Sequence, residues 1–250
     1  MLVRPYSNHT LVELPLGLTE PPRVAFPPAT LKADVVVANS SYLANYGRQY
    51  NVKSYFIGQG CDLSAFDPQV ELPVPSDIGS IPKPIVGYAG ALLDFRLDIE
   101  TIKHIAISRP DWSVVLVGPE DEAFKKSDLH ALSNVYFLGS KPFNQVPAYI
   151  NLFDVCINPQ AVNLNTLGNY PRKVDEYLAM GKPVVATATE AMQLFSDFTY
   201  LCEGKNAYPQ QIEKALRENS DQHRQARRAF SLGHSWENNV SELYSAIRKV

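Results

Sequence analysis

The stretch that decides the fold class is Trp112-Ser113-Val114-Val115-Leu116-Val117-Gly118. Its four consecutive apolar residues, with no polar residue between them, predict a short strand that is buried on both faces. A strand of this kind belongs to a parallel sheet that helices cover on both sides. The stretch therefore predicts an α/β protein.

The same rhythm of short apolar runs and helical segments continues on both sides of this strand. Strands are predicted at 84–89, 112–117, 134–138, 153–158, 183–187 and 198–202, and helices at 94–108, 120–132, 144–152 and 171–180. Three further predicted helices, at 209–219, 221–232 and 235–250, close the chain. We therefore expect a doubly wound, Rossmann-like parallel sheet whose ligand lies beyond the carboxyl ends of the strands.

Two clusters of proline flank a smaller unit near the N-terminus. Six prolines lie between residues 5 and 28 and five between residues 68 and 84, and proline disfavours helix interiors and central strands, so both clusters are predicted to be loops or linkers. Between them, 33–40 and 52–57 are predicted strands and 42–50 a predicted helix. We expect three parts: residues 1–67, a linker at 68–83, and a larger domain at 84–250.

Composition and charge exclude several function classes. The chain of 250 residues has a net charge of −3, which lacks the basic field that nucleic-acid binding needs. No apolar run approaches the roughly 18 residues of a membrane span, so we expect no transmembrane segment and a cytoplasmic location, with peripheral membrane association left open. Three widely spaced cysteines and the lack of an Asp-x-Asp motif predict neither a disulfide framework nor a metal site.

The stretch from Asn169 to Thr187 carries the most chemistry. Lys173 and Arg172 precede Glu176 by three and four residues, so the three side chains share one region near the start of the predicted helix. A cation there suits a diphosphate, and a carboxylate can accept two hydrogen bonds from a ribose diol. A solvated helix face with an ordinary ion pair explains the same residues equally well.

A second candidate is Gly87-Tyr88-Ala89-Gly90, which ends one strand and precedes a helix. Backbone amides at such a place can hold a phosphate, and tight packing between strand and helix explains the glycines equally well. The spacing is not that of dinucleotide binders, and no phosphate loop with Gly-Lys-Ser/Thr occurs, which disfavours dehydrogenases and P-loop enzymes.

The sequence Pro-x-Lys-x-x-Glu-Tyr-Leu-Ala-x-Gly-Lys-Pro-Val-Val, at residues 171–185, resembles the donor-binding motif of GT-B glycosyltransferases. The family is the large retaining one that includes sucrose-phosphate synthase-like and bacterial polysaccharide enzymes, and the teichuronic-acid and exopolysaccharide type carries a lysine at the position of Lys173. The resemblance extends in order from about residue 31 to residue 250. It includes Ala-Asp-Val-Val-Val-Ala-Asn-Ser at 33–40, Gly-Cys-Asp-Leu-Ser-Ala-Phe at 60–66 and Asn-Val-Tyr-Phe-Leu-Gly at 134–139.

The resemblance implies a function. It implies transfer of a sugar from a UDP- or GDP-type nucleotide sugar to the hydroxyl of a glycan or lipid-linked acceptor, with the anomeric configuration retained, in cell-surface polysaccharide synthesis. The nucleotide sugar would be a substrate, and neither a cofactor nor a metal is implied. Residues 84–250 would form the donor-binding lobe with its closing helices, and residues 1–67 a remnant of the acceptor-side lobe.

The resemblance also implies roles for particular residues. Lys173, against the diphosphate, and Glu176, at the ribose, are the predicted catalytic pair. The predicted donor-binding residues are Gly90, Arg96, Ser140, Lys141, Thr166, Asn169, Tyr170 and Arg172. Among these, Ser140 and Lys141 match the loop that contacts the nucleobase, and Gly90 matches the glycine beside the diphosphate.

Two positions depart from the family pattern. Gly168 stands where the family has the first glutamate of its pair, and Ala91 stands where a basic residue is usual. Arg96 is either a replacement for that basic residue or a surface residue of a helix.

Two other functions stay open. One is a nucleotide-sugar-binding module or inactive fragment, and the other is a sugar-nucleotide epimerase, whose acid/base groups we cannot place in this sequence. Because only residues 31–66 match the acceptor lobe, we expect a truncated or reduced enzyme that binds the donor without efficient transfer when this chain acts alone.

Overall fold

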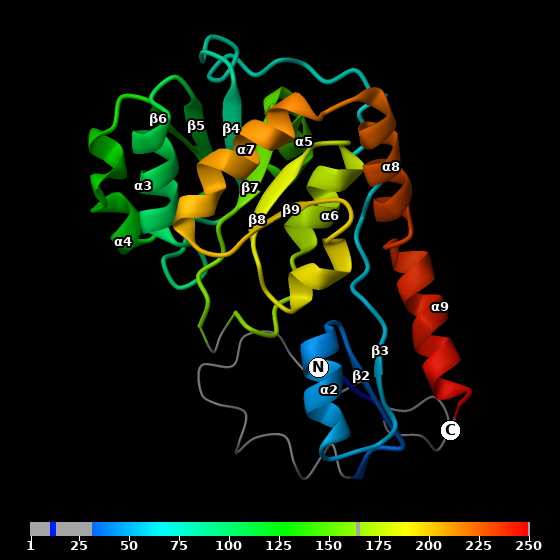
Figure 1. Cartoon of the computed structure of the whole chain (residues 1–250). Helices are drawn as coiled ribbons and strands as arrows, with labels where there is room; N and C mark the ends of the chain where they lie inside the picture. Colours follow the sequence, from blue (N-terminus) through cyan, green and yellow to red (C-terminus); the bar gives the residue numbers. More distant parts are fainter. Residues whose placement is uncertain (1–10, 14–31, 164–165, 250) are drawn as a thin grey trace.

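The larger part of the protein is built on a six-stranded parallel sheet (Figure 1). The computed structural model describes residues 11–13, 32–163 and 166–249. The sheet has the order β6-β5-β4-β7-β8-β9, and every pairing in it is parallel. Its strands are β4 (Ile85–Ala89), β5 (Ser113–Val117), β6 (Val135–Gly139), β7 (Val155–Asn158), β8 (Val184–Thr187) and β9 (Tyr200–Cys202). The predicted doubly wound α/β sheet is confirmed.

The order of the strands places a switch point between β4 and β7. The chain starts in the middle at β4, adds β5 and β6 on one side, and then returns to add β7, β8 and β9 on the other. Loops after β4 and β7 therefore leave in opposite directions and open a crevice at the carboxyl ends of these two strands. This crevice is where a ligand is expected.

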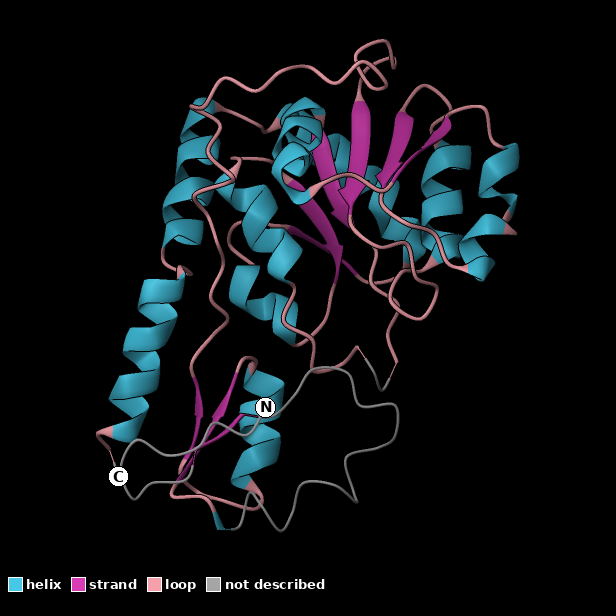
Figure 2. Ribbon diagram, turned by 180° about the vertical axis from the view of Figure 1, so that it is seen from behind, coloured by secondary structure: helices cyan, strands magenta, loops and turns pink. Residues whose placement is uncertain are grey.

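Helices cover both faces of this sheet (Figures 1 and 2). Residues of α3 (Ile99–Ser108) and α7 (Tyr208–Arg217) pack with Val114 and Leu116 of β5, whereas those of α5 (Val146–Leu152) and α6 (Arg172–Ala179) pack with Val115 and Val117. All four of these β5 residues are at most 2% exposed. Burial on both faces explains why the strand is apolar from Val114 to Val117.

Two predicted helices differ from the observed ones. The helix predicted at 94–108 begins later, as α3, because the Asp98 side chain accepts a hydrogen bond from the amide of Glu100 and caps the helix there. The single helix predicted at 120–132 is wrong. The structure has α4 (Glu122–Lys125) and a separate 3-10 turn, η1 (Asp128–Ala131), because Ser127 is extended and its hydroxyl bonds the carbonyl of Phe124.

The remaining helices agree closely with the sequence pattern. They include α8 (Asp221–Leu232) and α9 (Trp236–Ile247), which are capped by the hydroxyls of Ser220 and Ser235. Short 3-10 turns add η2 (Phe143–Gln145), η3 (Ala191–Phe195) and η4 (Lys205–Ala207), of which η3 and η4 lie outside every predicted element. None of the described helices is long and apolar enough to cross a membrane.

A second, smaller sheet contains β1 (Leu11–Glu13), β2 (Val35–Ala38) and β3 (Ser54–Phe56), all parallel, with helix α2 (Ser41–Arg48) between β2 and β3. The predicted strand–helix–strand unit is confirmed. The predicted loop at 5–28 is wrong for 11–13, because the gap between Pro5 and Pro15 leaves room for a short strand. The other residues of that predicted loop lie outside the described ones.

The chain crosses between the two sheets twice, and the crossings lie side by side. Cys61 forms a parallel bridge with Ser235, and its amide donates to the carbonyl of His234 at 3.0 Å. Beyond the second crossing, Leu243 and Ile247 of α9 pack against Val35 and Val37 of β2. The end of the chain therefore returns to the smaller sheet (Figure 2).

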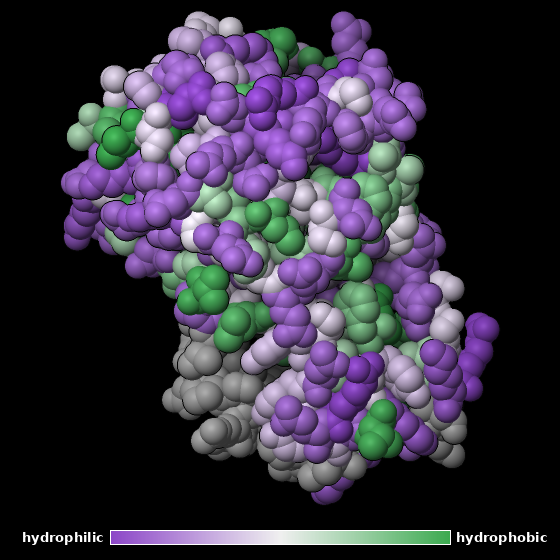
Figure 3. All heavy atoms as spheres, viewed as in Figure 1, coloured by the Kyte–Doolittle hydropathy of each residue, from purple (hydrophilic) through white to green (hydrophobic). Residues whose placement is uncertain are grey.

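The apolar side chains of α9 differ in how far they are covered. Leu243 and Ile247 belong to the packed cluster, whereas Trp236 and Val240 are 48% and 44% exposed. Figure 3 shows hydrophilic side chains over the larger part of the molecule and hydrophobic ones gathered lower on the same face, where the two sheets approach each other. Phe56 and Leu194 border a cavity of about 180 Å³ between the two parts.

Candidate functional site

A cavity of about 330 Å³ lies at the switch point of the larger sheet. Its walls come from the end of β4 and the loop after it, from the end of β7, from the loop that leads into α6, and from the first crossing. The lining residues are Gln59, Tyr88, Arg96, Leu97, Asn158, Gln160, Thr166, Asn169, Tyr170, Pro171, Arg172 and Lys173. We call this space the switch-point cavity.

Lys173 contributes a partly buried cation to the switch-point cavity. Its ammonium lies 5.8 Å from the centroid of the Tyr88 ring, and a Cβ atom added to Gly90 would overlap with its Cε and Nζ atoms. Gly90 also has a positive φ of 153°, which other residues rarely adopt. Burial lowers the pKa of Lys173, and the nearby charge of Glu176 partly opposes this.

Tight packing explains Gly87, whereas the phosphate-binding role of the amides near Gly90 stays a prediction, because the Gly90 amide donates to the carbonyl of Val117 at 2.7 Å. A Cβ on Gly87 would overlap with the ring of Phe153, so this glycine permits tight packing. Gly90 instead makes room for the ammonium of Lys173. The second glycine is therefore part of the site, and the first is part of the core.

Glu176 lies close to Arg172 and Lys173, and its side chain is buried, with 7% of the residue exposed. Its Oε1 atom is 3.3 Å from Nε of Arg172. Burial raises the pKa of the Glu176 carboxyl, and the charges of Lys173 and Arg172 oppose this shift. With Arg96 in the lining, three cations face one carboxylate, which makes the region suited to an anion.

Six of the ten predicted site residues line the switch-point cavity: Arg96, Thr166, Asn169, Tyr170, Arg172 and Lys173. Gly90 and Glu176 adjoin it through their contacts with Lys173 and Arg172. Ser140 and Lys141 are not in the lining. The Lys141 ammonium binds Asp77 at 2.6 Å instead, so the nucleobase role of this loop stays a prediction.

The other six lining residues were not predicted as site residues, and four of them have polar side chains: Gln59, Tyr88, Asn158 and Gln160. Asn158 ends an otherwise apolar strand, and a polar residue at the carboxyl end of a strand next to the switch point is a usable signal. Gln59 carries no such signal, because its place in the cavity depends on how the first crossing folds back toward α6.

Tyr170, in the cavity wall, is anchored by a buried cluster around Asp175, which is itself completely buried. Asp175 accepts hydrogen bonds from the Tyr170 hydroxyl at 2.8 Å and from the Cys61 thiol at 3.4 Å, and its other oxygen lies 2.6 Å from Nδ1 of His234. Burial raises the pKa of both Tyr170 and Cys61, so both remain donors. The cluster ties the cavity wall to both crossings.

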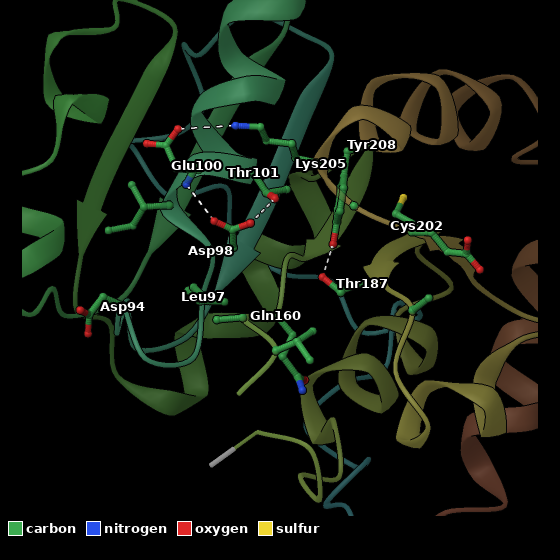
Figure 4. Close-up of a pocket in the computed structure, with 16 residues that line it drawn as sticks. Asp94, Leu97, Asp98, Glu100, Thr101, Gln160, Thr187, Cys202, Lys205 and Tyr208 are labelled. Carbon is green, nitrogen blue, oxygen red and sulfur yellow. Dashed lines mark hydrogen bonds and ion pairs between the residues drawn. The ribbon is translucent and has the colours of Figure 1, made fainter. Parts of the chain in front are cut away.

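A wider cavity of about 680 Å³ adjoins the first and shares Leu97 and Gln160 with it (Figure 4). Its charged residues are the acids Asp94, Asp98, Glu100 and Glu203 and the cation Lys205, which is 3.7 Å from Glu100. Asp98 caps α3 and also accepts from the Thr101 hydroxyl (Figure 4). The excess of carboxylates repels a diphosphate, so charge rather than volume selects the switch-point cavity.

No group of three or more His, Cys, Asp or Glu side chains that could hold a metal ion occurs in the part of the chain that the structure describes.

Comparisons with known proteins agree with this architecture. The model of the family described as glycosyl transferases group 1 matches residues 83–221. The putative teichuronic acid biosynthesis glycosyltransferase TuaH of Bacillus subtilis is 28% identical over 237 residues, which are 87% of this chain and 58% of TuaH. The chain thus spans less than two thirds of the length of this relative.

Solved structures share the fold. HepE of Anabaena, in complex with UDP, superposes with a TM-score of 0.72 at 18% identity, over 96% of this chain and 72% of HepE. Sucrose-phosphate synthase of Thermosynechococcus elongatus gives a TM-score of 0.69 at 21% identity, over 89% of this chain and 60% of the enzyme. The predicted GT-B type of α/β fold is confirmed by these likenesses.

Proposed function

The chain belongs to the group 1 family of glycosyl transferases, and from this premise we propose that it transfers a sugar from a nucleotide sugar, bound in the switch-point cavity, to an acceptor hydroxyl. The observation that carries the proposal is the convergence of Arg96, Arg172 and Lys173 on one cavity at the carboxyl ends of β4 and β7. Three cations in this place match the charge of a diphosphate.

The relatives support the kind of substrate. HepE forms complexes with UDP and with UDP-glucose, and TuaH is named for teichuronic acid biosynthesis. We accordingly propose a donor of UDP type, with GDP as the alternative base, and a glycan or lipid-linked acceptor in polysaccharide synthesis. The anomeric configuration is proposed to be retained.

The cations would act on the leaving group. When the bond between the sugar and the phosphate breaks, negative charge grows on the diphosphate and positive charge grows on the sugar ring. A partly buried, preorganised cation such as Lys173 stabilises the growing negative charge, and loss of one such donor in comparable sites costs about 3 to 4 kcal/mol of the barrier. Because Lys173 is held by Tyr88 and Gly90, little reorganisation is needed during the reaction.

A second candidate is a module that binds the nucleotide sugar without transfer. Among the described residues, the lining of the switch-point cavity contains no carboxylate. Gly168 lies beside the first turn of α2, where an added Cβ would be 3.2 Å from the side chains of Tyr42 and Leu43. This position therefore supplies no acid or base to the sugar, which favours binding over efficient turnover by this chain alone.

One experiment separates these functions. The chain is incubated with radiolabelled UDP-, GDP- and ADP-sugars, with and without a polysaccharide or lipid-linked acceptor. A labelled acceptor supports transfer. A labelled nucleotide sugar that stays bound to the protein, with no labelled acceptor formed, supports the binding module. An epimerised sugar without acceptor, or no binding of any donor, contradicts the proposal.

A further inference from the structure

Asn158, the last residue of β7, lines the switch-point cavity and has a side-chain hydrogen-bond donor that no described residue uses. The residue lines the cavity and is 7% exposed. Its side-chain nitrogen Nδ2 is buried and has no hydrogen-bond partner among the residues that the structure describes. Leaving a buried donor without a partner destabilises a protein, so its presence in a cavity wall points to a ligand that completes the bond.

The polar groups around Asn158 are already occupied. The Gln160 amide nitrogen donates to the carbonyl of Thr166 at 3.0 Å, and the Thr166 hydroxyl donates to the carbonyl of Ala161 at 2.5 Å. The backbone carbonyl of Asn158 itself accepts from the Tyr208 hydroxyl at 3.3 Å. The local scaffold is thus held by other bonds, and the Asn158 side-chain nitrogen is left over for a ligand.

A second amide group reaches the cavity from the first crossing. Gln59 lines the cavity and accepts a hydrogen bond from the Asn39 side chain at 2.8 Å. The Asn39 side-chain oxygen is also buried without a partner in the described part of the chain. The cavity therefore contains uncharged amides from β7 and the crossing, in addition to the cations from α6 and the loop after β4.

These two kinds of group fit two parts of one ligand. Phosphate oxygens are served by Arg96, Arg172 and Lys173, whose charges give stronger hydrogen bonds than an amide does. An uncharged amide nitrogen suits an uncharged oxygen, and a sugar presents several hydroxyl oxygens that accept such a bond. Because Glu176 is predicted to serve the ribose and the loop of Ser140 and Lys141 the base, the transferred sugar is the part of a nucleotide sugar that leaves a role for Asn158.

We propose that Asn158 is a specificity-determining residue that donates a hydrogen bond from Nδ2 to a hydroxyl of the transferred sugar. This inference rests on the proposed function, because it assumes that a nucleotide sugar occupies the switch-point cavity. A site built to bond a hydroxyl discriminates against ligands that lack it, since the protein group is then left unpaired.

The test compares Asn158→Leu with Asn134→Leu. Asn134 is the matched control, because its side-chain nitrogen is fully used by the carbonyls of Ala106, Arg109 and Trp112. Affinities for UDP-glucose and for UDP are measured by calorimetry, and the thermal midpoint of each ligand-free protein is recorded. UDP serves as the probe without a sugar.

We expect Asn158→Leu to weaken binding of the sugar nucleotide without loss of stability, and Asn134→Leu to lower stability without loss of binding. In Asn158→Leu, the affinity for UDP-glucose falls about tenfold, the affinity for UDP stays within about twofold, and the thermal midpoint stays equal or rises. In Asn134→Leu, the midpoint falls and both affinities stay unchanged.

Three results overturn the inference while leaving the proposed function intact. They are unchanged binding of UDP-glucose by Asn158→Leu, an equal loss of UDP and UDP-glucose binding, and a fall of the midpoint as large as that of Asn134→Leu. If the unaltered protein binds neither UDP nor UDP-glucose, the proposed UDP-type donor fails and the inference fails with it.

Discussion

Lys173 is the residue on which the electrostatics of the site depend. Its ammonium is removed from water against Tyr88 and Gly90, and the charge of Glu176 only partly offsets the lowered pKa. A bound diphosphate would place negative charge beside the ammonium and raise its pKa again. Binding of the nucleotide and protonation of Lys173 should therefore be coupled.

This coupling predicts a pH dependence. The protonated form binds the diphosphate, so the affinity for UDP should be full below the lowered pKa of Lys173 and should fall as the pH rises through it, at a pH below the ordinary value of 10.5. Calorimetry across this pH range measures the effect. Lys173→Arg should abolish the decline, because arginine does not lose its proton there, and the same decline in this variant would contradict the assignment.

Gly90 gives a second prediction at the scale of one residue. Gly90→Ala would displace the end of the Lys173 side chain and should lower the affinity for UDP about tenfold. Gly204→Ala is the matched control, since Gly204 also has a positive φ, of 83°, but has open space around the added Cβ. Equal affinities in both variants would show that Gly90 does not make room for a binding cation.

At the scale of elements, α6 joins the binding site to the rest of the molecule. Its outer residues, Arg172 and Lys173, line the cavity, and its buried Asp175 holds Tyr170 and both crossings. The Ser231 hydroxyl of α8 also donates to the backbone carbonyl of Asp175 at 2.9 Å. The helix therefore positions the cations by the same bonds that connect the two sheets.

Removal of this anchor should destabilise the fold. Asp175→Ala leaves the buried groups of Tyr170, Cys61 and His234 without their acceptor and is expected to lower the free energy of unfolding by about 3 kcal/mol, measured by urea denaturation. Asp128→Ala, which removes an exposed ion pair with Lys103, should leave the free energy of unfolding nearly unchanged. Similar losses in the two variants would contradict the structural role of Asp175.

The elements that the sequence predicted well are those whose pattern is local. The predicted apolar strands and the helices α8 and α9 agree with the structure. Burial on both faces requires a run of apolar residues, and each helix cap requires a serine, so both can be recognised in the sequence. The helix predicted at 120–132 failed because the Ser127 hydroxyl competes for the carbonyl of Phe124. β1 was not predicted, because the prolines on both sides of this three-residue strand indicated a loop.

The site residues that the sequence predicted are likewise those that lie close together in the sequence. Arg172, Lys173 and Glu176 lie close together on one helix, so their spacing was sufficient to group them. Asn158 and Gln59 reach the cavity from β7 and from the first crossing, and only the folded chain brings these segments to α6. Spacing along the sequence does not predict which residues of distant segments come together in the folded protein.

At the scale of the whole molecule, the candidate site combines contributions from both sides of the crossings. Gln59 enters the cavity from the first crossing, and Gly168 lies beside α2 of the smaller sheet. The division at 1–67, 68–83 and 84–250 stays a proposal about the domains, and α9 of the last part packs on β2 of the first. The segment 68–83 nevertheless packs on the larger part, since Ile78 is 1% exposed in its core and Asp77 binds Lys141.

The central claim is that a nucleotide diphosphate binds in the switch-point cavity, and calorimetric titration of UDP tests it most directly. The account predicts saturable binding by the unaltered chain and at least about tenfold weaker binding by Lys173→Ala and by Glu176→Ala. The first variant removes a cation that would face the diphosphate, and the second removes the carboxylate that would accept hydrogen bonds from the ribose. Lys103→Ala, which removes an exposed lysine paired with Asp128, should bind UDP as the unaltered chain does. Equal affinities in all four proteins, or no binding by the unaltered chain, would contradict the account.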